Sequence, residues 1–253
     1  MTSIAVLGAT GNLGQHVARE ALARDWSLVV GVRSRSRLAP EVVERAQVTD
    51  IDLATASPGE LAALADGRDA CICCAGVVTE GDRFVFLIDR VVTALETIPV
   101  HRRPVCWFLS GAALLPIDAS GRVGLDLPKV RDTFWPHRLN HQRLVRSTLD
   151  WRLLCPGPMV DQPAIGLERL RISIESLPSP LPAITRSLPA LLVLPLFAMK
   201  IPEMIVPYAD AASVMLSNVR RGGPMSGKRV GIALPVGMKG RKDEWATKPR
   251  GAS

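Results

Sequence analysis

The chain has 253 residues, of which 47% are hydrophobic and 22% charged; this is typical of a soluble globular protein and is long enough for one large α/β domain. Its net charge of +7 does not indicate a nucleic-acid partner, because the sequence has no arginine-rich helical pattern interleaved with aromatic residues. An anionic cofactor accounts more economically for part of that charge.

The N-terminal residues predict a strand, a glycine turn and a helix. Four apolar residues (4–7) lead into Gly8, Gly11 and Gly14, and residues 15–24 follow with the spacing of an amphipathic helix. Glycine lets the backbone turn tightly and approach phosphates, while a new helix offers unpaired N–H groups and a positive dipole end. This order of elements predicts a bound dinucleotide; the alternative is a purely structural strand–helix turn.

Strands and helices then alternate as far as residue 154. Strands are predicted at 27–32, 46–51, 69–74, 105–109 and 151–154, and helices at 41–46, 58–64, 83–96 and 137–148. Residues 112–136 are predicted as an irregular loop because prolines and glycines interrupt them. Strands that are apolar on both faces and alternate with helices indicate a parallel sheet covered on both sides, with ligands bound beyond the carboxyl ends of the strands.

The later part of the chain is less regular. We predict one Rossmann-type α/β domain over residues 1–238, a doubly wound parallel sheet whose proline-rich segment 158–207 forms a small loop-rich lobe. A helix is predicted at 208–219 and a last strand at 228–234, at the sheet edge. The tail 239–253 is polar and basic, which predicts disorder.

Residues 187–199 (SLPALLVLPLFAM) are almost wholly apolar. The stretch is too short to span a bilayer and contains Pro189 and Pro195, so a membrane partner is not favoured. A cover over a small-molecule substrate is favoured, or else an interface with a protein partner or a second copy of the chain.

The cysteines indicate a reducing compartment. Five are present, in apolar strand-like runs, and neither their odd number nor their spacing fits a disulfide framework or a zinc site. We therefore expect buried, unreactive thiols and no metal. No N-terminal signal pattern is visible, and we expect a cytoplasmic protein.

The turn Gly8-Ala9-Thr10-Gly11-Asn12-Leu13-Gly14 resembles the phosphate turn of the atypical short-chain dehydrogenases/reductases, the group that includes NmrA-like proteins and biliverdin-IXβ/flavin reductases. The resemblance is good over residues 1–160 and thin afterwards. It implies a Rossmann-type fold with an NAD(P) cofactor. The cofactor-binding residues that it implies are Gly8, Thr10, Gly11, Asn12, Leu13, Gly14, Arg33, Ser34, Arg37, Asp52, Leu53, Cys74, Ala75, Gly76, Ser110, Pro156, Gly157 and Met159.

Arg33 is the best discriminator between the two dinucleotides. An acid at the end of the second strand would bind the ribose hydroxyls of NAD, whereas a guanidinium suits the 2′-phosphate of NADP. With Arg37 nearby and no acid before Glu41, we expect NADP rather than NAD; the alternative is a solvated run of charge. Asp52 could accept a hydrogen bond from the adenine amine or could be an ordinary turn residue.

The catalytic pair of the larger family is missing. That family uses Tyr-x-x-x-Lys, and the one tyrosine of this chain, Tyr208, lies far from the expected helix. The helix carries His137 and His141 instead, four residues apart and so on one face. Imidazole titrates near neutral pH, which makes His137 a candidate general acid, although a surface histidine is the simpler interpretation. Ser110 is the second catalytic candidate. It follows the strand 105–109, where the family that this chain resembles places a hydroxyl beside the nicotinamide, and it could hold a substrate carbonyl or a water; the alternative is a plain Ser-Gly turn.

Taken together, the residues and the resemblance predict an NADP(H)-dependent oxidoreductase. Its substrate would be a small planar or apolar molecule: a flavin, a quinone or a conjugated carbonyl. The alternative is a non-catalytic NADP-binding sensor or partner-binding protein of the NmrA-like type.

Overall fold

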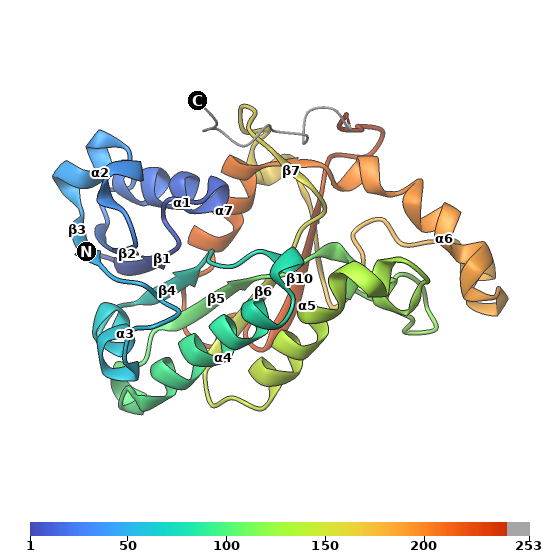
Figure 1. Cartoon of the computed structure of the whole chain (residues 1–253). Coiled ribbons are helices and arrows are strands. Elements are labelled where there is room, and N and C mark those ends of the chain that lie inside the picture. Colours follow the sequence, from blue (N-terminus) through green and yellow to red (C-terminus); the bar gives the residue numbers. More distant parts are fainter. Residues whose placement is uncertain (242–253) are drawn as a thin grey trace, which may run out of the picture.

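The computed structural model describes residues 1–241 and is built around a mostly parallel eight-stranded sheet with helices on both faces (Figure 1). The strand order is β3-β2-β1-β4-β5-β6-β10-β8, in which only β8 is antiparallel to its neighbour. The strands of this sheet are β1 (Ser3–Leu7), β2 (Ser27–Val32), β3 (Gln47–Asp50), β4 (Ala70–Cys73), β5 (Val105–Leu109), β6 (Asp150–Cys155), β8 (Arg171–Ile174) and β10 (Lys228–Ala233). This architecture confirms the predicted Rossmann-type α/β fold.

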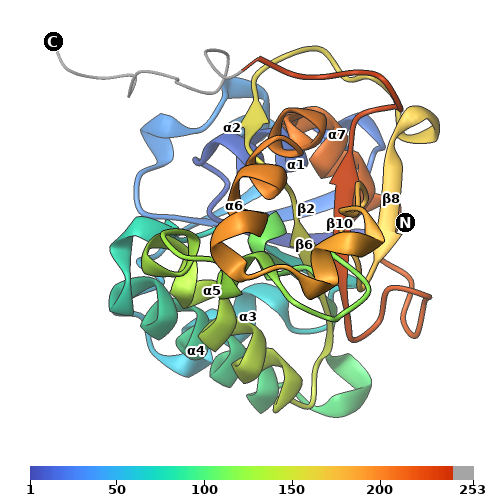
Figure 2. The same cartoon turned by 90° about the vertical axis from the view of Figure 1, so that its right-hand side faces the viewer.

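The helices form two layers (Figures 1 and 2). One layer contains α1 (Asn12–Ala23), α2 (Pro40–Arg45) and α7 (Tyr208–Leu216), and the other contains α3 (Pro58–Ala65), α4 (Asp82–Thr97) and α5 (Val130–Val145). A further helix, α6 (Ala190–Ala198), lies at the periphery beyond α5. Within residues 1–241, no helix is both long and apolar enough to cross a membrane.

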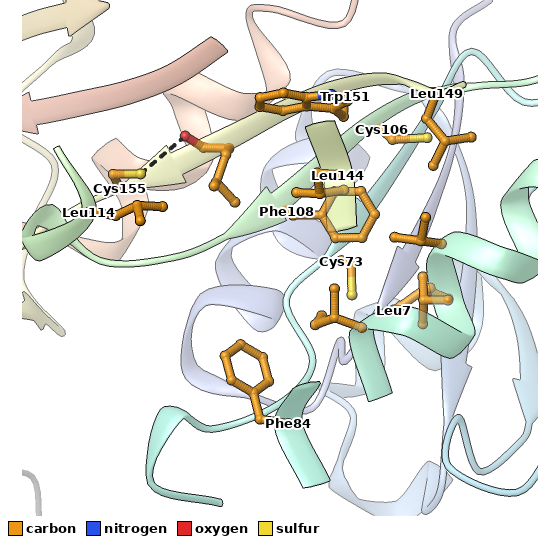
Figure 3. Close-up of a cluster of buried hydrophobic side chains, with 14 of the residues drawn as sticks. Leu7, Cys73, Phe84, Cys106, Phe108, Leu114, Leu144, Leu149, Trp151 and Cys155 are labelled. Atoms are coloured by element: carbon orange, nitrogen blue, oxygen red, sulfur yellow. Dashed lines mark hydrogen bonds between the residues drawn. The ribbon is translucent and has the colours of Figure 1, made fainter. Parts of the chain in front are cut away.

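Each face of the sheet has its own hydrophobic core. Phe84, Phe108 and Trp151 belong to the core on the side of α3, α4 and α5 (Figure 3). Val17 and Ala211 belong to the opposite core, where α1 packs against α7. Burial on both faces explains why strands β1, β2, β4 and β5 are nearly continuous apolar runs rather than alternating ones.

Two predictions are wrong: the start of one helix and the place of the last strand in the sheet. Helix α5 begins at Val130, not at residue 137, and contains Pro136. A proline removes one backbone hydrogen bond, and the packing of this helix against α4, with Pro136 itself buried, outweighs that loss. The last strand, β10, is not at the sheet edge, since β8 from the proline-rich segment pairs with its outer side. That segment is therefore more regular than expected; it also forms the two-stranded pair β7 (Met159–Val160) and β9 (Val206–Pro207). Of the tail predicted to be disordered, residues 242–253 lie outside the described part of the chain.

Candidate functional site

The turn after β1 brings two strand ends into close backbone contact. Gly8 has φ +82°, and a Cβ there would lie 2.8 Å from the backbone nitrogen of Ala75, which follows β4. A Cβ on Gly14 would lie 2.1 Å from the carbonyl oxygen of Gly8. Only glycine fits either position. The contact lies where the strand order reverses between β1 and β4, the point at which open α/β sheets bind ligands.

The N-terminus of α1 has the properties of an anion site. Its N-cap residue, Gly11, makes no side-chain capping bond, and the first turn contains no acidic residue. The Gln15 side-chain amide donates a hydrogen bond to the carbonyl oxygen of Thr10 at 3.1 Å, which stabilises the turn. The first-turn N–H groups and the positive helix end thus fit a pyrophosphate, and the glycines leave room for it.

The segment after β2 holds its arginines in two different ways. Arg35 is engaged with its own fold: it donates to the Val48 carbonyl oxygen at 3.0 Å and lies 3.7 Å from an Asp50 carboxylate oxygen. Arg33 and Arg37 are exposed and form no ion pair among residues 1–241. Two guanidinium groups are therefore available beside the predicted adenosine end. Ser34 is half-buried between them, and its hydroxyl lies 2.9 Å from that of Ser36.

Asp52 is already used by a turn. Its Oδ1 accepts a hydrogen bond from the Ala54 backbone N–H at 2.9 Å, and the adjacent Leu53 is buried in the core. This geometry favours the interpretation of Asp52 as a turn residue.

A pocket of about 510 Å³ opens at the carboxyl ends of β4, β5 and β6. Its walls come from the loops after these strands, from α4 and α5, and from α6 with the short 3-10 helix Ile201–Met204. The lining residues are Ala75, Gly76, Val77, Val78, Phe84, Leu109, Ser110, Gly111, Ala112, Ala113, Val130, Phe134, His137, Pro156, Gly157, Pro158, Met159, Leu194, Phe197, Ala198, Ile201 and Met204. The apolar segment 187–199 thus supplies part of the pocket wall, as expected of a cover.

The pocket brings together part of the predicted site. It includes Ala75, Gly76, Ser110, His137, Pro156, Gly157 and Met159. The remaining predicted residues do not line it: Gly8, Thr10, Gly11, Asn12, Leu13, Gly14, Arg33, Ser34, Arg37, Asp52, Leu53 and Cys74. They follow β1, β2, β3 and β4 along the same sheet edge, which is the arrangement that an extended dinucleotide with its reactive end in the pocket requires.

His137 is buried, so the interpretation as a surface histidine is wrong. Its ring lies edge-on to Phe84 at 5.8 Å and stacks on Phe134 at 6.1 Å between centroids. This burial lowers the pKa of His137 to about 4. The imidazole is therefore neutral near pH 7 and can donate one N–H without carrying a stored proton. The neighbouring His141 instead packs edge-on to Trp151 and does not line the pocket.

Two residues that line the pocket have buried polar atoms without a nitrogen or oxygen hydrogen-bond partner among residues 1–241. Ser110 Oγ and His137 Nδ1 are buried and have no hydrogen-bonding nitrogen or oxygen partner within residues 1–241. Buried polar atoms left unpaired are costly, so each of these two groups would gain from a hydrogen-bonding partner. The His137 ring packs against Gly111, the residue after Ser110, where an added Cβ would be 3.2 Å from His137 Nε2.

The cysteines are free thiols, as predicted, and all but Cys74 are buried. Burial raises the pKa of Cys73 to about 11 and that of Cys155 to about 12, although the Ser110 hydroxyl opposes the latter shift. Figure 3 shows Cys73, Cys106 and Cys155 within the core on the α4 side. These thiols are packing groups.

The sequence did not identify the aromatic clamp around His137 or the wall beyond residue 199. Phe134 falls in a stretch predicted as a loop because of Pro136, and Phe84 was visible only as one apolar position of a helix. Met204 closes the pocket against Gly157, where a Cβ would lie 2.6 Å from the Met204 carbonyl oxygen. No local pattern signals that contact across the lobe.

A family model described as NAD(P)H-binding matches residues 8–187, and a search of curated proteins found no match. Solved structures share the fold. A candidate NADH-flavin reductase from Streptococcus pneumoniae is 18% identical over 92% of this chain and 100% of that one, with a TM-score of 0.69. A wide-type short-chain dehydrogenase/reductase from Veillonella parvula, solved in complex with NADP, is 17% identical over 99% of both chains, with a TM-score of 0.61. The oxidoreductase ylbE from Lactococcus lactis is 17% identical over 96% of this chain and 95% of that one, with a TM-score of 0.64.

Proposed function

Because the chain belongs to the NAD(P)H-binding family, we propose that it is an NADP(H)-dependent reductase of a small planar or apolar substrate. The observation that carries this proposal is the largely apolar pocket at the ends of β5 and β6, whose lining includes the polar side chains Ser110 and His137, each with a buried atom that has no nitrogen or oxygen hydrogen-bond partner among the described residues. A flavin, a quinone or a conjugated carbonyl has the matching chemistry: a flat apolar body with one or two hydrogen-bond acceptors.

The choice of NADP rests on the arginines after β2. Arg33 and Arg37 have no carboxylate partner among the described residues and would meet the 2′-phosphate, whereas Arg35 is engaged elsewhere. The first turn of α1 would hold the pyrophosphate, and Pro156, Gly157 and Met159 would flank the nicotinamide. The Veillonella relative was solved with NADP, which supports the same preference here.

In the proposed reaction the side chains only donate hydrogen bonds to the substrate and exclude water from it. When bound, the reduced cofactor supplies a hydride. Ser110 Oγ and the neutral His137 imidazole donate hydrogen bonds to the substrate oxygen on which negative charge develops. The apolar walls from Phe84, Phe197 and Met204 exclude water, which strengthens those bonds. No charged general acid is needed for a substrate whose reduced anion takes its proton from solvent after it leaves the pocket.

A non-catalytic NADP-binding sensor is the second candidate. It is favoured by the outer side of α6, where Leu191, Leu192 and Met199 are 69%, 55% and 69% exposed. Such a surface suits a protein partner or a second copy of the chain.

The two candidates separate in one experiment. The protein is titrated with NADPH and NADH, and nicotinamide oxidation is then followed in single turnovers against a panel of flavins and quinones. The reductase is supported by NADPH-selective binding and by turnover that Ser110→Ala slows while leaving NADPH affinity unchanged. Binding without turnover on any acceptor would favour the sensor, and no binding of either dinucleotide would refute both.

A further inference from the structure

Four side chains from three parts of the chain meet beside the phosphate turn; we call them the Tyr208 cluster (Asn12, His16, Asp161 and Tyr208). The Asn12 side-chain amide donates to the Tyr208 hydroxyl at 3.2 Å. The His16 ring stacks on the Tyr208 ring, with 5.7 Å between centroids and 17° between planes. His16 Nε2 also lies 3.3 Å from an Asp161 carboxylate oxygen. The one tyrosine in the chain is thus fixed at both its ring and its hydroxyl.

The small sheet β7–β9 explains how these residues come together. Its two strands are parallel, with Met159 opposite Val206 and Val160 opposite Pro207. The chain therefore leaves both strands at the same end, with Asp161 following β7 and Tyr208 following β9. Figure 1 shows that α7, which begins at Tyr208, lies beside α1.

Buried polar contacts keep this arrangement in place. The Asp210 carboxylate is 1% exposed and accepts hydrogen bonds from the backbone N–H groups of Ile165 and Gly166 at 2.8 and 3.0 Å, which holds the loop after β7 against α7. Farther along α7, the Ser213 hydroxyl lies 2.9 Å from both carboxylate oxygens of Glu20 on α1. The position of Tyr208 relative to the phosphate turn is therefore set by the fold and not by a flexible loop.

The hydroxyl of Tyr208 has an unused donor. A phenol accepts hydrogen bonds and donates one; here it accepts from Asn12, and its own proton has no acceptor among residues 1–241. Asn12 is the first residue of α1, whose N-terminus has no side-chain cap. The donor thus lies next to the group of N–H donors that fits a pyrophosphate. The one carboxylate of the cluster, Asp161, is turned toward His16.

We propose that Tyr208 binds the dinucleotide pyrophosphate by donating its hydroxyl proton to a phosphate oxygen, with Asn12 orienting the phenol. This rests on the proposed function, since it requires a dinucleotide at the turn. Tyr208 thereby acts in cofactor binding and has no part in proton transfer to the substrate. The lobe beyond Gly157 would contribute to both ends of the site: the substrate pocket and the phosphates.

The test is calorimetric titration of Tyr208→Phe with two ligands, NADPH and adenosine 2′-monophosphate. The variant keeps the ring that stacks on His16 and loses only the hydroxyl. Because a hydrogen bond to a charged group is worth about 1.5–3 kcal/mol, NADPH should bind at least about tenfold more weakly. Adenosine 2′-monophosphate lacks the pyrophosphate and should bind the variant and the parent protein within twofold.

Two further variants make the result specific. Asn12→Ala should weaken NADPH binding, and combined with Tyr208→Phe it should cost less than the two single losses together, because both act on one hydrogen bond. Ser217→Ala is the matched control, since its hydroxyl accepts a hydrogen bond from Arg24 at the far ends of α7 and α1, away from the turn, and it should leave both affinities unchanged.

The inference is overturned if Tyr208→Phe binds NADPH within twofold of the parent, or if it loses equal affinity for both ligands. Its failure differs from that of the proposed function. A parent protein that binds NADPH without turnover leaves the affinity comparison intact, whereas a parent that binds no dinucleotide refutes the proposed function and the inference together.

Discussion

The glycine turn after β1 and the pocket at the ends of β4, β5 and β6 lie on the same edge of the sheet, yet they are held together differently. The turn is a contact of backbone with backbone, in which Gly8 approaches Ala75 and Gly14 approaches Gly8 too closely for any side chain. The pocket is a contact of side chains from the loops after β4, β5 and β6 and from α4, α5 and α6. Adding one methyl group in the turn should therefore abolish its geometry, whereas changing one side chain in the pocket should alter its shape only gradually.

The largest effect is expected from Gly14→Ala. The new Cβ would lie 2.1 Å from the Gly8 carbonyl oxygen, so the turn must move, and the N–H groups that fit the pyrophosphate move with it. Because each hydrogen bond to a charged group is worth about 1.5–3 kcal/mol, losing more than one should lower NADPH affinity by about 100-fold or more, as measured by calorimetry. Gly59→Ala in α3 is the control, because its Cβ meets nothing within 4 Å; it should leave affinity unchanged. Equal affinities for both variants would contradict the rigid turn.

In the pocket, Phe197→Ala should leave NADPH affinity unchanged but should lower the stability of the folded protein. Phe197 is 5% exposed and forms part of the pocket wall, and losing a buried phenyl ring costs about 3 kcal/mol of unfolding free energy. Leu191→Ala on the exposed side of the same helix should cost less than about 0.5 kcal/mol. Urea unfolding measures both. A Phe197→Ala variant that loses NADPH affinity would show that the two regions are not separate.

The difference between local backbone contacts and side-chain contacts from distant elements also determines what could be predicted from the sequence. The glycine turn was predictable because its partners, Gly8, Gly11 and Gly14, are neighbours along the chain and their spacing reports a backbone geometry. The strand ends followed from apolar runs, and with them the positions of Ser110 and Pro156. The setting of His137 was not predictable, since it depends on Phe84 from α4 and on a helical turn containing Phe134 that Pro136 concealed. The contact of Tyr208 with Asn12 joins residues 196 positions apart, and no local pattern carries it.

The buried imidazole predicts a pH dependence that the turn does not share. The pKa of His137 is about 4 in the folded protein and near 6.5 when unfolded, so the unfolded chain takes up the proton first as the pH falls. Stability present above pH 6.5 is therefore lost on the way to pH 4, by about 2 kcal/mol between pH 7 and pH 5. Urea unfolding at the two pH values should show this loss, and it should be smaller by about that amount in His137→Gln. An equal loss of stability in the parent protein and in His137→Gln would mean that a group other than His137 causes the pH dependence.

The smallest effect is expected at the exposed end of the proposed cofactor site, where the arginines after β2 would bind the 2′-phosphate. Arg33→Ala should weaken NADPH binding about tenfold, because a charge-assisted hydrogen bond to a phosphate is lost, and should leave NADH binding unchanged. Arg45→Ala is the control: it removes the same charge but bonds Leu22 and Asp25 at the far end of α1. Parallel calorimetric titrations with the two dinucleotides distinguish a contact with the 2′-phosphate from a general loss of positive charge. If Arg33→Ala and Arg45→Ala weaken NADPH binding equally, Arg33 is a solvated charge, and the preference for NADP must come from Arg37 or not exist.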